Sequence, residues 1–237
     1  MKSKKVVLAI SILIVLVLGL ACAGTRPFKV SEDEFYQKVH KLAFTPVEFN
    51  VKVSTAIQKE KQELAQQLIT EYLNKLSRFE LIDPATCERV RIETMKELGI
   101  EGFFDPTTGE VDEEKFASFC KYYLQKVGAD AWLYVSFVKG KTVLAYTDAD
   151  AYNIYHVTEE VPAVDLYANI ADQNNNTLWE AQTLVGSMVE RRYCIDIPVV
   201  GCLLSLGQKR NKSFPPEHAL KDSNVKVAVK KTFKSLK

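Results

Sequence analysis

Between residues 131 and 138 the chain reads AWLYVSFV, an almost continuous run of apolar and aromatic side chains. A run of this length without polar alternation is typical of a strand that is buried on both faces of a sheet. We therefore expect a central strand here, with Trp132, Leu133, Val135 and Phe137 in the core.

Three segments that precede this strand are predicted to be helices. Residues 60–78 carry apolar side chains at every third or fourth position, which gives one continuous apolar stripe. Residues 84–98 follow Asp83, a good N-cap, and begin with a proline, which suits the first helical position. A third helix is expected between Asp112, as N-cap, and Gly128, as C-cap.

The remaining elements are predicted to be mostly strands. Residues 47–53 alternate apolar and polar side chains, and residues 79–82 form a short apolar segment. Residues 163–171 and 177–186 flank a polar turn and predict an antiparallel hairpin. Residues 225–236 have the pattern of an amphipathic C-terminal helix.

The expected order is strand, helix, strand, two helices, four strands and a final helix. This order indicates a mixed β-sheet with helices packed on it, in the α/β or α+β class. Residues 139–141 are predicted to form a turn, and residues 142–155 an edge strand or an excursion, because Asp148 and Asp150 interrupt the apolar pattern. Residues 187–214 are expected to be irregular.

The first residues have the layout of a secretory signal peptide. Lys2, Lys4 and Lys5 precede an apolar run over residues 6–20, and small residues follow at 21–24. The apolar run is shorter than the ~20 residues needed to span a bilayer, so a retained membrane helix is the weaker alternative. Export across a membrane is the prediction.

Cys22 stands at the expected cleavage point, and this arrangement resembles the lipobox of bacterial lipoproteins. The resemblance implies that the Cys22 thiol carries a diacylglyceryl group and becomes the new N-terminus. Ala21 fits the pattern, whereas Gly19 stands where leucine is usual; cleavage by ordinary signal peptidase would instead give a secreted chain. The predicted division is a signal peptide (1–21), a lipidated N-terminus and tether (22–44), and a single α/β domain (45–237) with insertions near 99–111, 142–160 and 187–214.

The order of elements behind a signal peptide resembles a group of bacterial envelope lipoproteins. Four places carry the resemblance: the helix 62–78 that leads into 79–82, the helix that leads into the 131–138 strand, the hairpin of 164–172 with 177–181, and the helix 225–236. The group includes the curli-secretion-channel lipoproteins and the penicillin-binding-protein activators. Its core resembles the N-terminal domain of the Tol translocation protein and the anticodon-binding fold. The resemblance implies an outer-membrane lipoprotein that faces the periplasm and binds an envelope protein.

Charge and residue spacing argue against several ligand classes. The chain has 31 basic and 30 acidic side chains, and Lys2, Lys4 and Lys5 would be lost with the leader. The remaining chain is therefore slightly acidic overall, which does not favour nucleic acid as a partner. We expect no metal or cofactor, because no two cysteines have metal-ligand spacing and the histidines lie far from them.

The sequence shows no catalytic motif and predicts a non-enzymatic protein. It contains neither a glycine-rich phosphate loop nor a Gly-x-Ser-x-Gly motif. Cys120 with His156 would be a nucleophile–base pair, but a packed thiol on an apolar helix face is favoured for Cys120. Asp148, Asp150 and Asp172 would be needed together to hold a cation, and a solvated loop is favoured because no glycine stands at an EF-hand position.

Two stretches are candidate interaction surfaces. Tyr146, Tyr152 and Tyr155 are interspersed with polar residues and predict either a binding surface or an ordinary edge strand. Residues 195–206 are rich in aliphatic side chains between basic flanks, which indicates contact with a membrane or partner, or a segment tucked under the domain. The aliphatic residues of this stretch are Ile195, Ile197, Val199, Val200, Leu203, Leu204 and Leu206.

Cys194 and Cys202 flank much of this aliphatic stretch. Lipidation of Cys22 would leave an even set of four cysteines, and an exported protein can form disulfides. We predict a disulfide between Cys194 and Cys202, which would close a loop with an apolar tip.

The leading functional hypothesis is a non-enzymatic lipoprotein that binds a partner or assists assembly in the cell envelope. The first alternative is an oligomeric secretion or pore component similar to the curli channel, which would need long amphipathic segments such as residues 132–155. The second alternative is a secreted hydrolase, which would need a deep pocket with convergent titratable groups.

Overall fold

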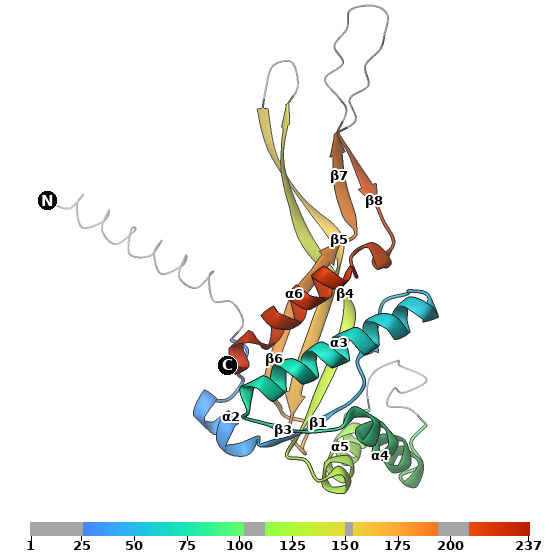
Figure 1. Cartoon of the computed structure of the whole chain (residues 1–237), viewed down its shortest axis with the longest axis vertical. Helices are drawn as coiled ribbons and strands as arrows, with labels where there is room; N and C mark the ends of the chain where they lie inside the picture. Colours follow the sequence, from blue (N-terminus) through green and yellow to red (C-terminus); the bar gives the residue numbers. More distant parts are fainter. Residues whose placement is uncertain (1–25, 102–111, 150–153, 194–208) are drawn as a thin grey trace, which may run out of the picture.

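The computed structural model describes residues 26–101, 112–149, 154–193 and 209–237. Its main sheet is six-stranded, with the order β3-β1-β4-β5-β6 and with β2 paired to β4 (Figure 1). β1 runs parallel to β3 and β4, whereas β4, β5 and β6 are antiparallel neighbours. The strands are β1 (Lys41–Phe44), β2 (Glu48–Phe49), β3 (Glu80–Ile82), β4 (Ala131–Ala149), β5 (Ile154–Ala171) and β6 (Thr177–Ser187). The predicted mixed sheet with packed helices is confirmed.

The helices begin and end where the sequence places capping residues. Asp83 and Asp112 accept hydrogen bonds from the backbone N–H of Thr86 and Lys115, and Gly128 ends its helix with φ 72°. No helix in the described ranges is long and apolar enough to cross a membrane. The helices are α2 (Glu32–Lys38), α3 (Thr55–Leu76), α4 (Pro84–Glu97), α5 (Glu113–Val127) and α6 (Asp222–Thr232), with short 3₁₀ turns η1 (Pro216–His218) and η2 (Phe233–Leu236).

α2, α3 and α6 cover one face of the sheet. Leu133, Val135 and Phe137 of β4 are fully buried on this face, in one cluster with Ile69 of α3 and Val229 of α6. Because successive residues of a strand point to opposite faces, this pattern places every second residue of β4 in the same core. The predicted burial of these residues is confirmed.

α4 and α5 cover the other face near β1 and β4. Trp132 points to this side, where it packs edge-on against Tyr123 and donates a hydrogen bond from Nε1 to Thr45 Oγ1 at 3.0 Å. Cys87 and Cys120 are buried in the same cluster as free thiols, which confirms the prediction that Cys120 is a packed residue. β4 is therefore covered on both faces only over its first part.

The predicted turn at residues 139–141 is wrong, because β4 continues through it to Ala149. Gly140 pairs with Ala163 inside the β4–β5 ladder, and a Cβ at this position would overlap the Asp165 carboxylate. Glycine thus makes room for a neighbouring side chain here and does not mark a turn. Residues 142–149 and 154–155 likewise belong to the long antiparallel β4–β5 pair.

The N-terminal boundary of the folded part also differs from the prediction. Residues 22–44 were expected to form a tether, but α2 and β1 occupy residues 32–44, and β1 lies between β3 and β4. Phe28 forms a β-bridge with Trp179 of β6, so the described chain is attached to the sheet almost from its first residue. The predicted strand over 47–53 is reduced to the two residues of β2.

Two hairpin arms project from the body on the same side (Figure 1). One is the distal part of β4 and β5, in which Lys139 to Ala149 pair with residues 154–164. The other is formed by β7 (Val189–Tyr193) and β8 (Lys209–Ser213), which are antiparallel. Residues 187–214 were expected to be irregular, and this expectation is wrong for the two strands.

Candidate partner-binding groove

An opening that is lined by both helical layers lies between α3 and α4. Pro46 follows the end of β1, and Ala85 lies in the first turn of α4 just after β3, so both mark the carboxyl ends of parallel strands. The chain leaves these ends toward α3 on one face of the sheet and toward α4 on the other. Crevices at such topological switch points are the usual binding places in open α/β sheets.

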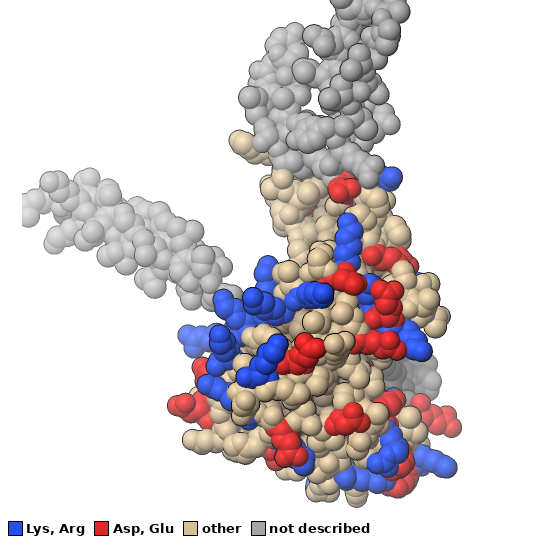
Figure 2. Space-filling model, in the orientation of Figure 1, with Lys and Arg blue, Asp and Glu red and all other residues tan. Residues whose placement is uncertain are grey.

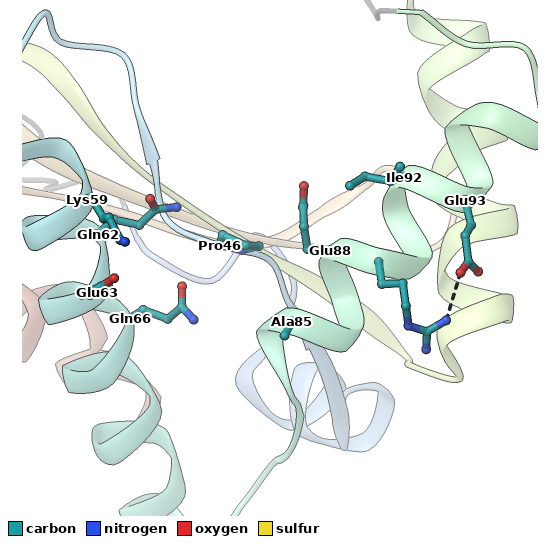
Figure 3. Close-up of a pocket in the computed structure, with 10 residues that line it drawn as sticks. Pro46, Lys59, Gln62, Glu63, Gln66, Ala85, Glu88, Ile92 and Glu93 are labelled. Atoms are coloured by element: carbon teal, nitrogen blue, oxygen red, sulfur yellow. Dashed lines mark hydrogen bonds and ion pairs between the residues drawn. The ribbon is translucent and has the colours of Figure 1, made fainter. Parts of the chain in front are cut away.

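The groove has a volume of about 760 Å³ and is open to solvent (Figure 3). Pro46, Ala85 and Ile92 give it apolar surface, and Ile92 is 55% exposed although it is a large aliphatic residue. Gln62 and Gln66 extend from α3 toward the gap (Figure 3). Neither glutamine side chain forms a hydrogen bond with another described residue, so both amides remain available to a ligand.

The charged residues of the α4 wall are already paired with one another. Arg91 binds Glu88 through two hydrogen bonds of 2.7 Å, and this pairing raises the pKa of Arg91. Arg89 binds Glu93 at 3.0 Å. The dashed line that ends at Glu93 in Figure 3 marks this ion pair. Paired and solvent-exposed charges of this kind contribute little to stability, and they leave the wall close to neutral.

A second depression of about 300 Å³ continues the groove along β2. It shares Pro46, Gln62 and Glu88 with the first and extends to Glu48 and Phe49. Together they form an elongated channel whose lining contains no histidine, cysteine or serine. This shape and lining suit an extended polypeptide segment better than a small substrate that must be enclosed for catalysis.

A separate cavity of about 850 Å³ lies at the base of the β4–β5 arm. Asp165 is 8% exposed there, and its Oδ2 accepts a hydrogen bond from Gln182 Nε2 at 2.7 Å. Its Oδ1 has no hydrogen-bond partner among the described residues. The carboxylate lies against Gly140, where no side chain could be accommodated. Asp165 Oδ1 is therefore an acceptor that a hydrogen-bond donor could still use.

Most of the predicted site residues lie outside the described residues. Tyr146 and Tyr155 fall on the distal β4–β5 arm, where Tyr146 pairs with Val157 and Asp148 pairs with Tyr155. The residues that lie outside the described part are Cys22, Tyr152, Cys194, Ile195, Ile197, Val199, Val200, Cys202, Leu203, Leu204 and Leu206.

The structure keeps apart the residues of the two predicted alternatives, the Cys120–His156 nucleophile–base pair and the cation site that needs both Asp148 and Asp172. Cys120 is buried between α5 and the sheet, where burial raises its pKa to about 12, whereas His156 is exposed on the distal arm. Asp172 caps the β5–β6 turn through the backbone N–H groups of Asn174 and Asn176, at the opposite end of β5 from Asp148. Among the described residues, no group of three or more His, Cys, Asp or Glu side chains could hold a metal ion.

The sequence did not reveal the groove, because Pro46 reaches the start of α4 only through the pairing of β1 with β3. Gln62 and Gln66 were recognisable as polar residues of an exposed helix face, which is the ordinary pattern of a solvated helix. The useful signal would have been that a loop with Thr45 and Pro46 follows a buried strand, but the strand over residues 41–44 was not predicted.

Comparison with known proteins gives only distant similarities. The sequence matches no protein-family model, and it matches no curated protein. The C-terminal domain of LpoB from Salmonella enterica aligns over 62% of this chain and 82% of its own, with 13% identity and a TM-score of 0.31. Lipoprotein GNA1162 from Neisseria meningitidis aligns over 61% and 78%, with 16% identity and a TM-score of 0.31. A putative neuraminyllactose-binding hemagglutinin homolog from Helicobacter pylori aligns over 90% and 86%, with 12% identity and a TM-score of 0.31.

Proposed function

We propose that the chain is a non-enzymatic lipoprotein of the cell envelope, anchored through Cys22, whose α/β domain binds an extended segment of a partner protein. The groove between α3 and α4 is the proposed binding site. The observation that carries the proposal is a pair of amides, Gln62 and Gln66, that form no hydrogen bond with the described part of the chain. They face exposed apolar surface at Ile92 across an elongated channel.

The chemistry of the groove selects the class of partner. A glutamine amide can both donate to a backbone carbonyl and accept from a backbone N–H, so it can bind an extended peptide without regard to its side chains. Pro46, Ala85 and Ile92 would take one aliphatic side chain of that peptide. Apolar surface of this kind, surrounded by polar groups, is the usual composition of a protein interface.

The anchor is tested by replacing its lipid acceptor. Cys22→Ala is expected to move the protein from the membrane fraction to the soluble envelope fraction, because no other residue of the signal can carry the diacylglyceryl group. Mass spectrometry of the mature N-terminus should find a modified Cys22 in the unmutated chain. An unmodified Ala23 or Gly24 as the first residue would contradict the lipoprotein assignment.

The groove is tested by site-specific photocrosslinking. The crosslinker p-benzoylphenylalanine at position 92 is expected to give one discrete adduct with a partner, whereas the same label at Tyr122, which is 56% exposed on α5, gives none. The adduct should disappear when Gln62 and Gln66 are both changed to alanine, with little effect on stability because these side chains are not buried in the core. Equal labelling from positions 92 and 122, or an adduct that survives the double change, would contradict the proposal.

A second candidate function is self-association of the kind an oligomeric secretion component requires. The specific observation is the distal β4–β5 arm. In the described residues, β4 pairs only with β5 beyond Phe137, so its other edge has no neighbouring strand there. β5 pairs with β6 only from Ala163 onward, so the distal part of β5 has no β6 neighbour either. Such unpaired edges can bind a strand of another chain. Photocrosslinking at Val143, which is 61% exposed on this arm, distinguishes the two candidates, because adducts between copies of the chain would favour self-association.

A further inference from the structure

The last seventeen residues carry a dense cluster of exposed lysines. The segment contains a single acidic side chain, Asp222, which is bonded to Lys61 of α3 at 2.5 Å. The lysines form no ion pair with any other described residue. The cluster, called here the lysine face, consists of Lys221, Lys226, Lys230, Lys231, Lys234 and Lys237, all of them exposed.

The lysine face follows from the amphipathic pattern of α6 and η2. Val225, Ala228, Val229 and Phe233 point into the core, so the lysines at positions 226, 230 and 234 are left on the outer side, one helical turn apart. Val227 is 50% exposed beside them. Since like charges one turn apart repel each other, this arrangement does not stabilise the isolated helix.

The lysine face lies next to the point where the N-terminal segment joins the domain. The Pro27 carbonyl accepts a hydrogen bond from the Glu180 N–H, and Phe28 is bridged to Trp179. The Trp179 ring in turn stacks on Phe233 and donates from Nε1 to Ser235 Oγ at 3.0 Å. Figure 1 shows the C-terminus close to the place where the described chain begins, and Figure 2 shows basic side chains gathered on this part of the surface.

The tether is too short to hold this face far from a membrane. Four peptide units separate Cys22 from Arg26, the first described residue, and a fully extended chain covers at most ~3.6 Å per residue. An anchor at Cys22 therefore holds Arg26 within about 15 Å of the lipid headgroups. This inference rests on the proposed lipid anchor.

We propose that the lysine face rests on an anionic lipid surface and orients the anchored domain. Lysines close to a membrane are attracted by anionic headgroups, and the attraction declines over about 10 Å at moderate ionic strength. The chain as a whole is almost neutral, with 31 basic and 30 acidic side chains, so the attraction is local and comes from the placement of these lysines. The exposed Val227 would enter the headgroup layer among them.

The test measures lysine reactivity on the intact lipoprotein in vesicles. The purified chain is inserted into vesicles of phosphatidylcholine alone or with three-tenths phosphatidylglycerol, and acetylation of each lysine is quantified by mass spectrometry. In the anionic vesicles at low salt, Lys226, Lys230 and Lys234 are expected to react about five-fold more slowly, and 0.5 M KCl should restore their reactivity. Lys96 and Lys121, exposed on α4 and α5, serve as internal controls and should not change.

Two variants complete the test. Changing Lys226, Lys230 and Lys234 to glutamate should leave the neighbouring Lys231 and Lys237 equally reactive in the two vesicle types. The same change at Lys52, Lys96 and Lys121 should preserve the slower reaction of Lys226, Lys230 and Lys234 in the anionic vesicles. Equal reactivity of the lysine face in both vesicles would overturn the inference. If the chain fails to associate with phosphatidylcholine vesicles, the proposed lipid anchor is wrong. Cosedimentation of the unanchored chain with the anionic vesicles then tests the lysine face alone. Absence of this cosedimentation would overturn the inference about the lysine face.

Discussion

Replacement of Trp179 by alanine is expected to lower the free energy of unfolding by about 3–5 kcal/mol, the range typical of large aromatic residues in cores. The Trp179 side chain has no exposed surface and stacks on Phe233 with ring centroids 5.7 Å apart. It also joins three parts of the chain, because it lies on β6, bridges to Phe28 and donates a hydrogen bond to Ser235. Its removal would weaken the contacts of the N-terminal segment and of the C-terminal helix together.

Urea unfolding followed by circular dichroism measures this effect, with Trp179→Phe as the matched control. Phenylalanine keeps the ring that stacks on Phe233 and loses the indole N–H, so it should cost clearly less than alanine. Equal losses for the two variants would show that the hydrogen bond to Ser235 dominates and that the packing argument is wrong. An unchanged midpoint for Trp179→Ala would place the residue outside the core.

The helices were predictable because their signals are local. Asp83 and Asp112 cap the backbone only three residues further along the chain, and Gly128 ends α5 through its own backbone conformation. Such signals act within one turn and need no knowledge of the rest of the fold. The apolar run at residues 131–138 was equally informative, because a strand buried on both faces needs apolar residues at nearly every position.

β1 was missed because its identity depends on partners that are distant in sequence. Lys41 pairs with Glu80, and Leu42 pairs with Ala131, so the strand exists only between two others. Four residues are too few to show a period, and the preceding α2 is also short. The groove depends on the same parallel pairs, since they bring the end of β1 beside the start of α4.

Gly140 explains why a turn was wrongly predicted at residues 139–141, within the β4–β5 arm. Lys-Gly-Lys is a reasonable turn when only the sequence is considered, because glycine and flanking charges are typical of turns. In the structure the space at Gly140 is occupied by the Asp165 carboxylate from the neighbouring strand. A close approach between strands explains the glycine, and no local pattern could reveal it.

Cys120 is expected to make the stability of the protein fall at alkaline pH. Burial raises the pKa of this thiol to about 12 in the folded state, whereas an unfolded cysteine ionises near pH 8.5–9. The folded state therefore binds more protons than the unfolded state above pH 9, and the free energy of unfolding decreases as the pH rises. The stabilisation that comes from the buried, protonated Cys120 thiol is fully present below about pH 8.5 and is lost progressively toward pH 12.

The contribution is isolated by comparison with Cys120→Ala, measured by urea unfolding under reducing conditions. Ionisation of other residues affects both proteins, so the difference between their free energies of unfolding reports the thiol alone. At pH 7.5 the two free energies of unfolding should differ only by the cost of removing the packed sulfur atom. Between pH 9 and pH 11 the unmutated chain should lose about 2–3 kcal/mol relative to the variant, since each unit of pH is worth 1.36 kcal/mol. A difference that stays constant with pH would mean that the thiol reaches solvent in the folded protein, and that the α5 layer is less closely packed on Trp132 than its buried surface indicates.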